Sequence, residues 1–215
     1  MKRHVKWAMA LAAAALAAGS ASAVMAACPP GLPAGIACGA PDLKLAPGGG
    51  YDVDPTHAGV VARVSHIGYS YSIFRFDHVK GHLVWDPAAP AKSSLTAEVD
   101  TGSIATNVPN FAAELSGDKF LDAKTFPAAT FVSTAFHQTG PTTGKVDGVF
   151  TLRGKSRPLT LDVTLIGAGA GFFGSPRLGV HAEGWINPQG YGLPPMFAVP
   201  IELLIDVEFA KAKAG

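Results

Sequence analysis

Strict alternation of apolar and polar residues constrains the fold of this chain more than any other feature of its sequence. Residues 159–165 alternate Leu or Val with Thr or Asp, and residues 95–100 alternate Leu, Ala and Val with Thr, Glu and Asp. Residues 199–209 repeat the pattern, with Leu204 as its break. Successive side chains of a strand point to opposite faces, so such segments are typical of half-buried β-strands. The sequence therefore predicts strands with one face toward an apolar interior.

Five further segments are rich in strand-forming residues and are bounded by Gly, Pro or Asp: residues 60–65, 76–86, 129–137, 145–152 and 177–186. Together they predict about eight strands, with no helical pattern between them. This favours an all-β fold, either a closed antiparallel barrel or a sandwich. Residues 110–123 depart from the pattern, because Phe111 and Leu115 stand four apart. They predict one or two helical turns lying across the barrel.

The first 23 residues predict a secretory signal peptide. Lys2, Arg3 and Lys6 precede an apolar run over residues 7–18, and residues 21–23, Ala-Ser-Ala, form a cleavage site. The run is shorter than the roughly 20 apolar residues that cross a bilayer. We therefore expect export to the periplasm and a soluble mature protein.

After cleavage the chain divides into two parts. Residues 24–50 are rich in Pro, Gly and Ala and predict a tether, whereas residues 51–210 predict a single domain. Removal of three basic residues leaves 14 (17 − 3) against 16 acidic ones. The basic residues are scattered rather than gathered in a stripe, so no nucleic-acid partner is expected.

The two cysteines, Cys28 and Cys38, lie in the predicted tether. In an oxidising compartment they are expected to pair, which would staple the Pro/Gly-rich segment rather than the core. A second interpretation is lipid attachment at Cys28, because residues 25–28, Met-Ala-Ala-Cys, loosely match such a site. The two interpretations exclude each other, and intact mass separates them.

No catalytic motif is present in the sequence. It has no G-x-S-x-G elbow, and the glycines of residues 167–174 are not followed by the Lys of a phosphate-binding loop. Histidines occur at His57, His66, His78 and His82, but on a strand the last two would stand about 13 Å apart, too far to share one ion. We expect neither an enzyme nor a metal site.

Between Tyr51 and Phe209 the chain resembles the YceI-like family of bacterial periplasmic polyisoprenoid-binding proteins. The resemblance covers about three quarters of the chain. It is carried, in this order, by residues 51–57 (YDVDPTH), 64–68 (VSHIG), 100–107 (DTGSIATN), 119–122 (KFLD), 126–134 (FPAATFVST) and 149–159 (VFTLRGKSRPL). Two departures are Phe74, where the family has Gly, and residues 185–193, where the family has an Arg-containing stretch.

The resemblance implies a lipocalin-like antiparallel barrel around an elongated apolar tunnel, with a helical segment near its mouth, and often a homodimer. It also implies periplasmic carriage or sequestration of a long apolar ligand, a polyisoprenoid or an isoprenoid quinone, without any other cofactor. An eight-stranded barrel is just wide enough for one slender molecule. Two other functions remain open, a stress-response or interaction barrel with a packed interior, and an enzyme acting on a lipid.

Large apolar residues near the helix and the strand ends are the candidate ligand-binding residues. They are Phe74, Phe76, Trp85, Phe111, Leu115, Phe120, Leu121, Phe131, Phe150 and Trp185. At the mouth, His66 and Arg63 are candidates to orient a head group, although a solvated surface role is the simpler interpretation. Phe172 and Phe173, in the Gly-rich connection, are candidates for a portal or a dimer contact.

Overall fold

The computed structural model describes residues 28–33, 36–171, 174–197 and 199–213. The predicted signal peptide therefore lies outside the described residues, as do Phe172 and Phe173. In the described part of the chain no helix is both long and apolar enough to cross a lipid bilayer.

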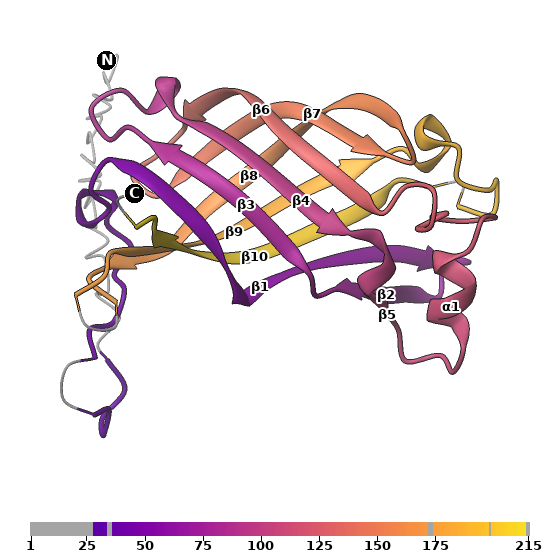
Figure 1. Ribbon diagram of the computed structural model, residues 1–215, viewed down its shortest axis with the longest axis horizontal. Helices are drawn as coiled ribbons and strands as arrows, with labels where there is room; N and C mark the ends of the chain where they lie inside the picture. The colour runs from indigo at the N-terminus through magenta and orange to yellow at the C-terminus, as the bar shows by residue number, and fades with distance from the viewer. Residues whose placement is uncertain (1–27, 34–35, 172–173, 198, 214–215) are drawn as a thin grey trace, which may run out of the picture.

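Ten strands form one antiparallel sheet (Figure 1). They are β1 (Gly49–His66), β2 (Ser70–Phe76), β3 (Val79–Trp85), β4 (Ser94–Asp100), β5 (Ile104–Ala105), β6 (Ala128–Gln138), β7 (Thr143–Leu152), β8 (Lys155–Gly169), β9 (Arg177–Ile186) and β10 (Ile201–Lys211). The short helices are η1 (Leu43–Leu45), η2 (Pro90–Lys92), η3 (Thr101–Ser103), α1 (Phe111–Ser116) and η4 (Pro188–Tyr191).

The sheet closes on itself because β1 pairs with β10. The barrel runs β1-β3-β4-β6-β7-β8-β9-β10, which makes eight strands and confirms the predicted all-β barrel. The strand expected over residues 76–86 is observed as β3, whereas β2 was not predicted, and both strands pair with the long β1. Strands β2 and β5 extend the barrel at one end, and α1 lies beside them as expected (Figure 1).

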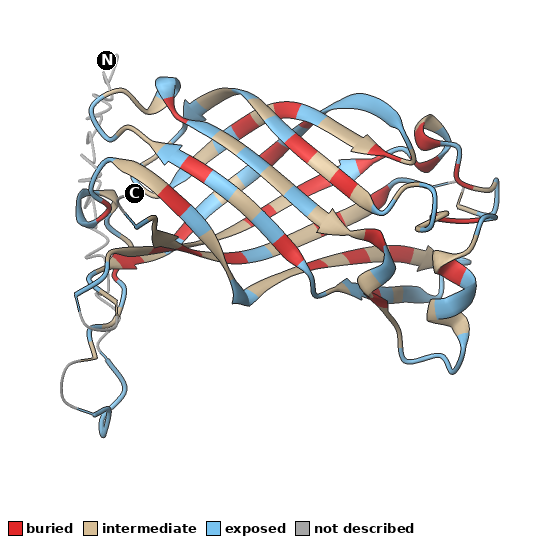
Figure 2. Ribbon diagram, viewed as in Figure 1, coloured by how far each residue is buried: buried red, intermediate tan, exposed pale blue. Residues whose placement is uncertain are grey.

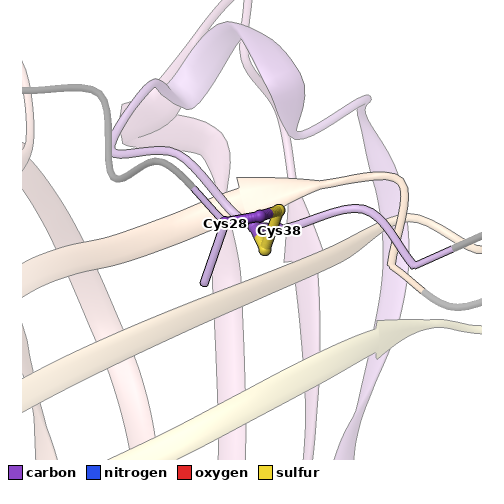
Figure 3. Close-up of a disulfide and its surroundings, with 2 residues drawn as sticks. All are labelled: Cys28 and Cys38. Carbon is purple, nitrogen blue, oxygen red and sulfur yellow. A yellow bond between two sulfur atoms is a disulfide. The ribbon is translucent and has the colours of Figure 1, made fainter. Parts of the chain in front are cut away.

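The tether is shorter than the sequence indicated. Ala40 exchanges two backbone hydrogen bonds with Ala168 of β8, at 2.9 and 2.8 Å. Ala46, directly after η1, is buried, and β1 already begins at Gly49. Residues 40–50 therefore pack against the barrel end that lies opposite α1. The disulfide Cys28–Cys38, with Cα atoms 5.5 Å apart, closes the segment just before them (Figure 3).

Strand β1 contains a β-bulge that is stabilised by ion pairs. Its register against β10 shifts between Val53 and Ala58. Asp54 lies in this bulge, and Arg177 of β9 donates to it at 2.6 Å and to Glu208 of β10 at 2.8 Å. A hydrogen bond from the Thr56 hydroxyl, with others from Arg177 and His57, holds the pKa of the Asp54 carboxyl well below its ordinary value. The guanidinium thus neutralises two carboxylates beside the bulge.

Replacing Arg177 by Gln is expected to lower the free energy of unfolding by about 1 to 3 kcal/mol at pH 7, since two charge-assisted hydrogen bonds are lost. A carboxyl whose pKa is lowered by folding stabilises the folded state fully above its unfolded pKa of about 3.9. This stabilisation is lost as the pH falls through the folded pKa. The difference in the free energy of unfolding between the unaltered protein and the Arg177→Gln variant should therefore become smaller below about pH 4. Urea denaturation from pH 7 to pH 2.5 measures it.

The control for this prediction is Arg75→Gln, which breaks an exposed pair with Asp77. Exposed ion pairs contribute about 0 to 1 kcal/mol. Equal losses in both variants at pH 7 would contradict a structural role for the Arg177 cluster.

Buried residues alternate along every long strand, as Figure 2 shows in red. They form two apolar clusters. The larger cluster includes Leu115, Phe120 and Phe74 at the α1 end, and the smaller includes Tyr51 and Phe209 at the end where η1 packs. Side chains of both clusters line the interior of the barrel.

Candidate ligand cavity

An apolar cavity of about 290 Å³ occupies the barrel interior. Its wall receives side chains from all eight barrel strands. It extends from Leu43 and Trp85 at the η1 end to Leu121 and Leu193 at the α1 end. The barrel is therefore hollow rather than filled by its own side chains.

Side chains along a strand point alternately inward and outward, and this alternation determines which residues line the cavity. On β8 the inward side chains are Leu159, Leu161, Val163 and Leu165, the series that alternates in the sequence. Small residues open the space between them, because Ala62, Ala97 and Ala182 stand on three different strands and also face inward. A cavity results where several strands each contribute a small side chain.

Five of the predicted ligand-binding residues lie in the cavity wall. They are Phe76, Trp85, Leu121, Phe131 and Phe150. Trp85 stands at the η1 end, where it packs on the smaller apolar cluster, and Leu121 stands at the α1 end. These five residues are in position to contact an apolar molecule along the length of the barrel.

Four others, Phe74, Phe111, Leu115 and Phe120, are not in the cavity wall but in the packing that covers its α1 end. The rings of Phe74 and Phe111 have centroids 6.1 Å apart. Leu115, the buried residue of α1, belongs to the same cluster. This group is the mouth cluster, and it separates the cavity from solvent.

Trp185 does not lie at the cavity, which corrects the prediction for this residue. Its side chain is half exposed on the outer face of β9. The neighbours Gly184 and Ile186 are buried, and Ile186 is in the cavity wall. Trp185 has the opposite strand phase, so its large ring points away from the interior.

The four histidines considered as metal ligands, His57, His66, His78 and His82, lie at the surface. His78 contacts Asp100 at 3.3 Å, and His82 contacts Asp52 at 2.7 Å. Arg63 is engaged on the outer face, where it pairs with Glu202 and stacks on Tyr71. His66 is exposed at the end of β1. Neither of the two head-group candidates lies in the cavity wall.

One cluster in the described part of the chain has the donor atoms for a cation. Atoms of Asp54, His57 and Glu208 lie within 4.8 Å of one another. The guanidinium of Arg177 already contacts both carboxylates of this cluster. Its positive charge already offsets part of the negative charge of this cluster.

Comparison with known proteins identifies the family. A model of the YceI-like domain matches residues 51–209 of this chain. The chain belongs to the YceI-like family. A UPF0312 protein of Pseudomonas putida strain W619 is 34% identical over 164 residues, which cover 75% of this YceI-like chain and 85% of the relative. One of Pseudomonas fluorescens strain SBW25 is 33% identical over the same length.

Solved structures share the YceI-like barrel. BcnA of Burkholderia cenocepacia has a TM-score of 0.63 at 24% identity, over 74% of this chain and 99% of that one. A polyisoprenoid binding domain from Saccharophagus degradans has a TM-score of 0.54 at 14% identity, over 75% and 98% of the two chains. At these identities the likeness shows a common fold.

In this YceI-like chain the α1 end of the cavity has a cover of two parts, the mouth cluster and the segment from η4 to β10. The sequence did not predict the second part. The ring of Phe197 lies 5.9 Å from that of Phe120, and the ring of Tyr191 lies 5.5 Å from that of Phe150. Burial raises the pKa of the Tyr191 phenol. The signal was present, because Asn187 caps a turn that begins with Pro188, a common helix start.

Arg153 ties the two parts of the cover together. From the β7–β8 turn its guanidinium donates to the carbonyl of Gly192, just after η4, and at 3.3 Å to the carbonyl of Asp118, just after α1. One side chain thus links three segments around the mouth. The cover is held by packing and by these hydrogen bonds.

Proposed function

We propose that this YceI-like protein binds a long, slender apolar molecule, a polyisoprenoid or an isoprenoid quinone, and carries or sequesters it in the periplasm. The observation that supports this proposal most directly is the apolar cavity walled by all eight strands. Its volume of about 290 Å³ is at the lower end of the range for ligand sites, which favours a narrow tail over a broad ring system.

The driving force comes from the tail. Each isoprene unit adds five carbons, and burial of each is worth about 0.8 kcal/mol. A wall without charged groups along most of its length can therefore retain such a chain with little contribution from the head group. The polyisoprenoid binding function of the Saccharophagus degradans domain, stated in its name, supports the same ligand class here.

Two further parts of the proposal rest on the sequence. The predicted signal peptide supports export, and the disulfide Cys28–Cys38 is suited to an oxidising compartment such as the periplasm. We propose a role in binding rather than in catalysis, since most of the wall is built from aliphatic and aromatic side chains, and polar residues such as His137, Gln138 and Lys145 lie at its η1 end. The alternative of a barrel with a packed interior conflicts with the cavity.

Native purification followed by lipid extraction and mass spectrometry tests the proposal. We expect a co-purifying prenyl compound, and we expect added prenyl compounds to raise the melting temperature, because a ligand that binds only the folded state stabilises it. Repeated preparations without any apolar molecule, together with an unchanged melting temperature, would remove the proposal. A decyl alcohol control separates prenyl recognition from general detergent effects.

A further inference from the structure

Exposed apolar side chains gather at the α1 end of the barrel, on loops that are separate in sequence. In the β1–β2 turn Ile67 is 81% exposed and Tyr69 is 89% exposed. Met196, between η4 and β10, is 71% exposed, and Val108, before α1, is half exposed. Figure 1 shows the three segments at the same end of the molecule. These three segments surround the residues that cover the α1 end of the cavity.

The β1–β2 turn has an unusual residue at its first position. The connection is residues 67–69, and Tyr69 donates its backbone N–H to the carbonyl of His66 at 3.0 Å, which makes Ile67 and Gly68 the two central residues of a tight turn. Both have positive φ, 54° and 78°. Turns of this kind favour Asn-Gly or Asp-Gly, because a β-branched residue is sterically disfavoured at positive φ. Since Ile67 is almost fully exposed, packing within the barrel does not account for it.

Positive charge lies at the same end. The β7–β8 turn carries Arg153, Lys155 and Arg157, and no Asp or Glu occurs over residues 148–161. Lys155 and Arg157 are exposed, and within the described residues neither forms a salt bridge. They lie against η4, since a Cβ at Gly192 would meet Lys155 and one at Gly190 would meet Arg157. The exposed acids Glu114, in α1, and Asp118, just after it, are offset by Lys119 and Lys124.

We infer that the α1 end of the barrel docks on the surface of an anionic phospholipid bilayer. Apolar side chains beside a patch of Lys and Arg are the combination that binds a lipid interface, the former by burial and the latter by attraction to anionic head groups. A flat lipid surface contacts several loops at once. This inference deepens the proposed carriage of a lipid, because the covered end of the cavity would face the bilayer from which the molecule is drawn.

The competing occupant is a second copy of this chain. On the edge of β2 away from β1, the described residues pair only at Arg75 and Phe76, with β5. An open edge of this kind can pair with another strand. A dimer through this edge would cover the β1–β2 turn, but it leaves the exposed Met196 and the basic β7–β8 turn without a role. The bilayer accounts for all of these features together.

Sedimentation of the protein with phosphatidylglycerol–phosphatidylcholine vesicles tests the inference. The double variant Ile67→Asn/Tyr69→Ser should bind at least about tenfold more weakly, from the apolar area no longer buried. Asn suits the turn, so its melting temperature should be equal or higher. Lys155→Gln and Arg157→Gln should each weaken binding to anionic vesicles about fivefold, an effect that high salt removes.

The matched control is Ile166→Asn, which removes an Ile that is 61% exposed on β8, the strand against which residues 40–46 pack. It should leave vesicle binding unchanged. Absence of vesicle binding by the unaltered protein, or equal losses in the control, would overturn the inference. So would a change from dimer to monomer in the turn variant with vesicle binding retained, since the turn would then be a subunit contact. Prenyl binding in solution should persist in the turn variant, which separates this test from that of the proposed function.

Discussion

Replacing Phe120 by alanine is expected to lower the free energy of unfolding by about 3 to 5 kcal/mol, the usual cost of removing a buried ring. The Phe120 ring is buried, packs edge-on against Phe197 and belongs to the larger apolar cluster. It does not line the cavity, so affinity for a prenyl compound should fall by less than the 1 to 3 kcal/mol or so expected of a ring in contact with ligand. Denaturation and binding measured on the same variant report both quantities.

Phe197→Ala serves as the partner variant. The two rings contact each other, so the double variant should be more stable than the sum of the single losses predicts, by about 0.5 to 1.5 kcal/mol. A Phe120 variant with full stability and strongly reduced affinity would show instead that the ring is part of the binding surface. That result would restore the ligand-binding role that the sequence predicted for Phe120.

Replacing Ala182 by phenylalanine should reduce affinity for a prenyl compound by about 100-fold or more, which corresponds to roughly 2.7 kcal/mol. Ala182 stands in the middle of β9, paired with Val163 and Ile205, and its side chain faces the cavity. A phenyl ring there would occupy space that the ligand needs. Because the ring enters an existing cavity, the free energy of unfolding should change by less than about 1.5 kcal/mol. Calorimetry and thermal denaturation give the two values.

Ala210→Phe is the control, because Ala210 lies on the outer face of β10, next to the inward Phe209. It adds the same ring outside the barrel and should leave affinity unchanged. If Ala182→Phe binds prenyl compounds as tightly as the unaltered protein, the cavity is not the binding site. The proposed function would then have to be rejected.

The sequence predicted the strands and their inward faces because alternation is a local property, whereas the choice of a barrel over a sandwich came from the resemblance to the YceI-like family. Leu159 and Leu161 identify an inward face without any knowledge of the neighbouring strands. The error at Trp185 arose because that residue was chosen for its size, although the even-numbered residues of β9, from Leu178 to Ile186, carry the inward phase. Reading the phase of the strand would have placed it correctly.

Other features depend on contacts that leave no local pattern. The docking of residues 40–46 is made by the backbone of Ala40, whose side chain gives no signal. The cavity itself depends on small residues of different strands, Ala62, Ala97 and Ala182, meeting across the interior. Each alanine alone is compatible with a filled barrel. The cover after η4 needs Phe197 to reach Phe120, a contact between distant parts of the chain.

The pairing of β1 with β10 also governs the order of events during folding. Tyr51 pairs with Lys211, so the seam of the barrel joins the first strand to the last. Contacts between residues so far apart in sequence form slowly, because a long loop must close first. The barrel cannot seal until its C-terminal strand is available. A chain with this strand order therefore stays open while it is being synthesised, and it closes only once β10 can pair with β1.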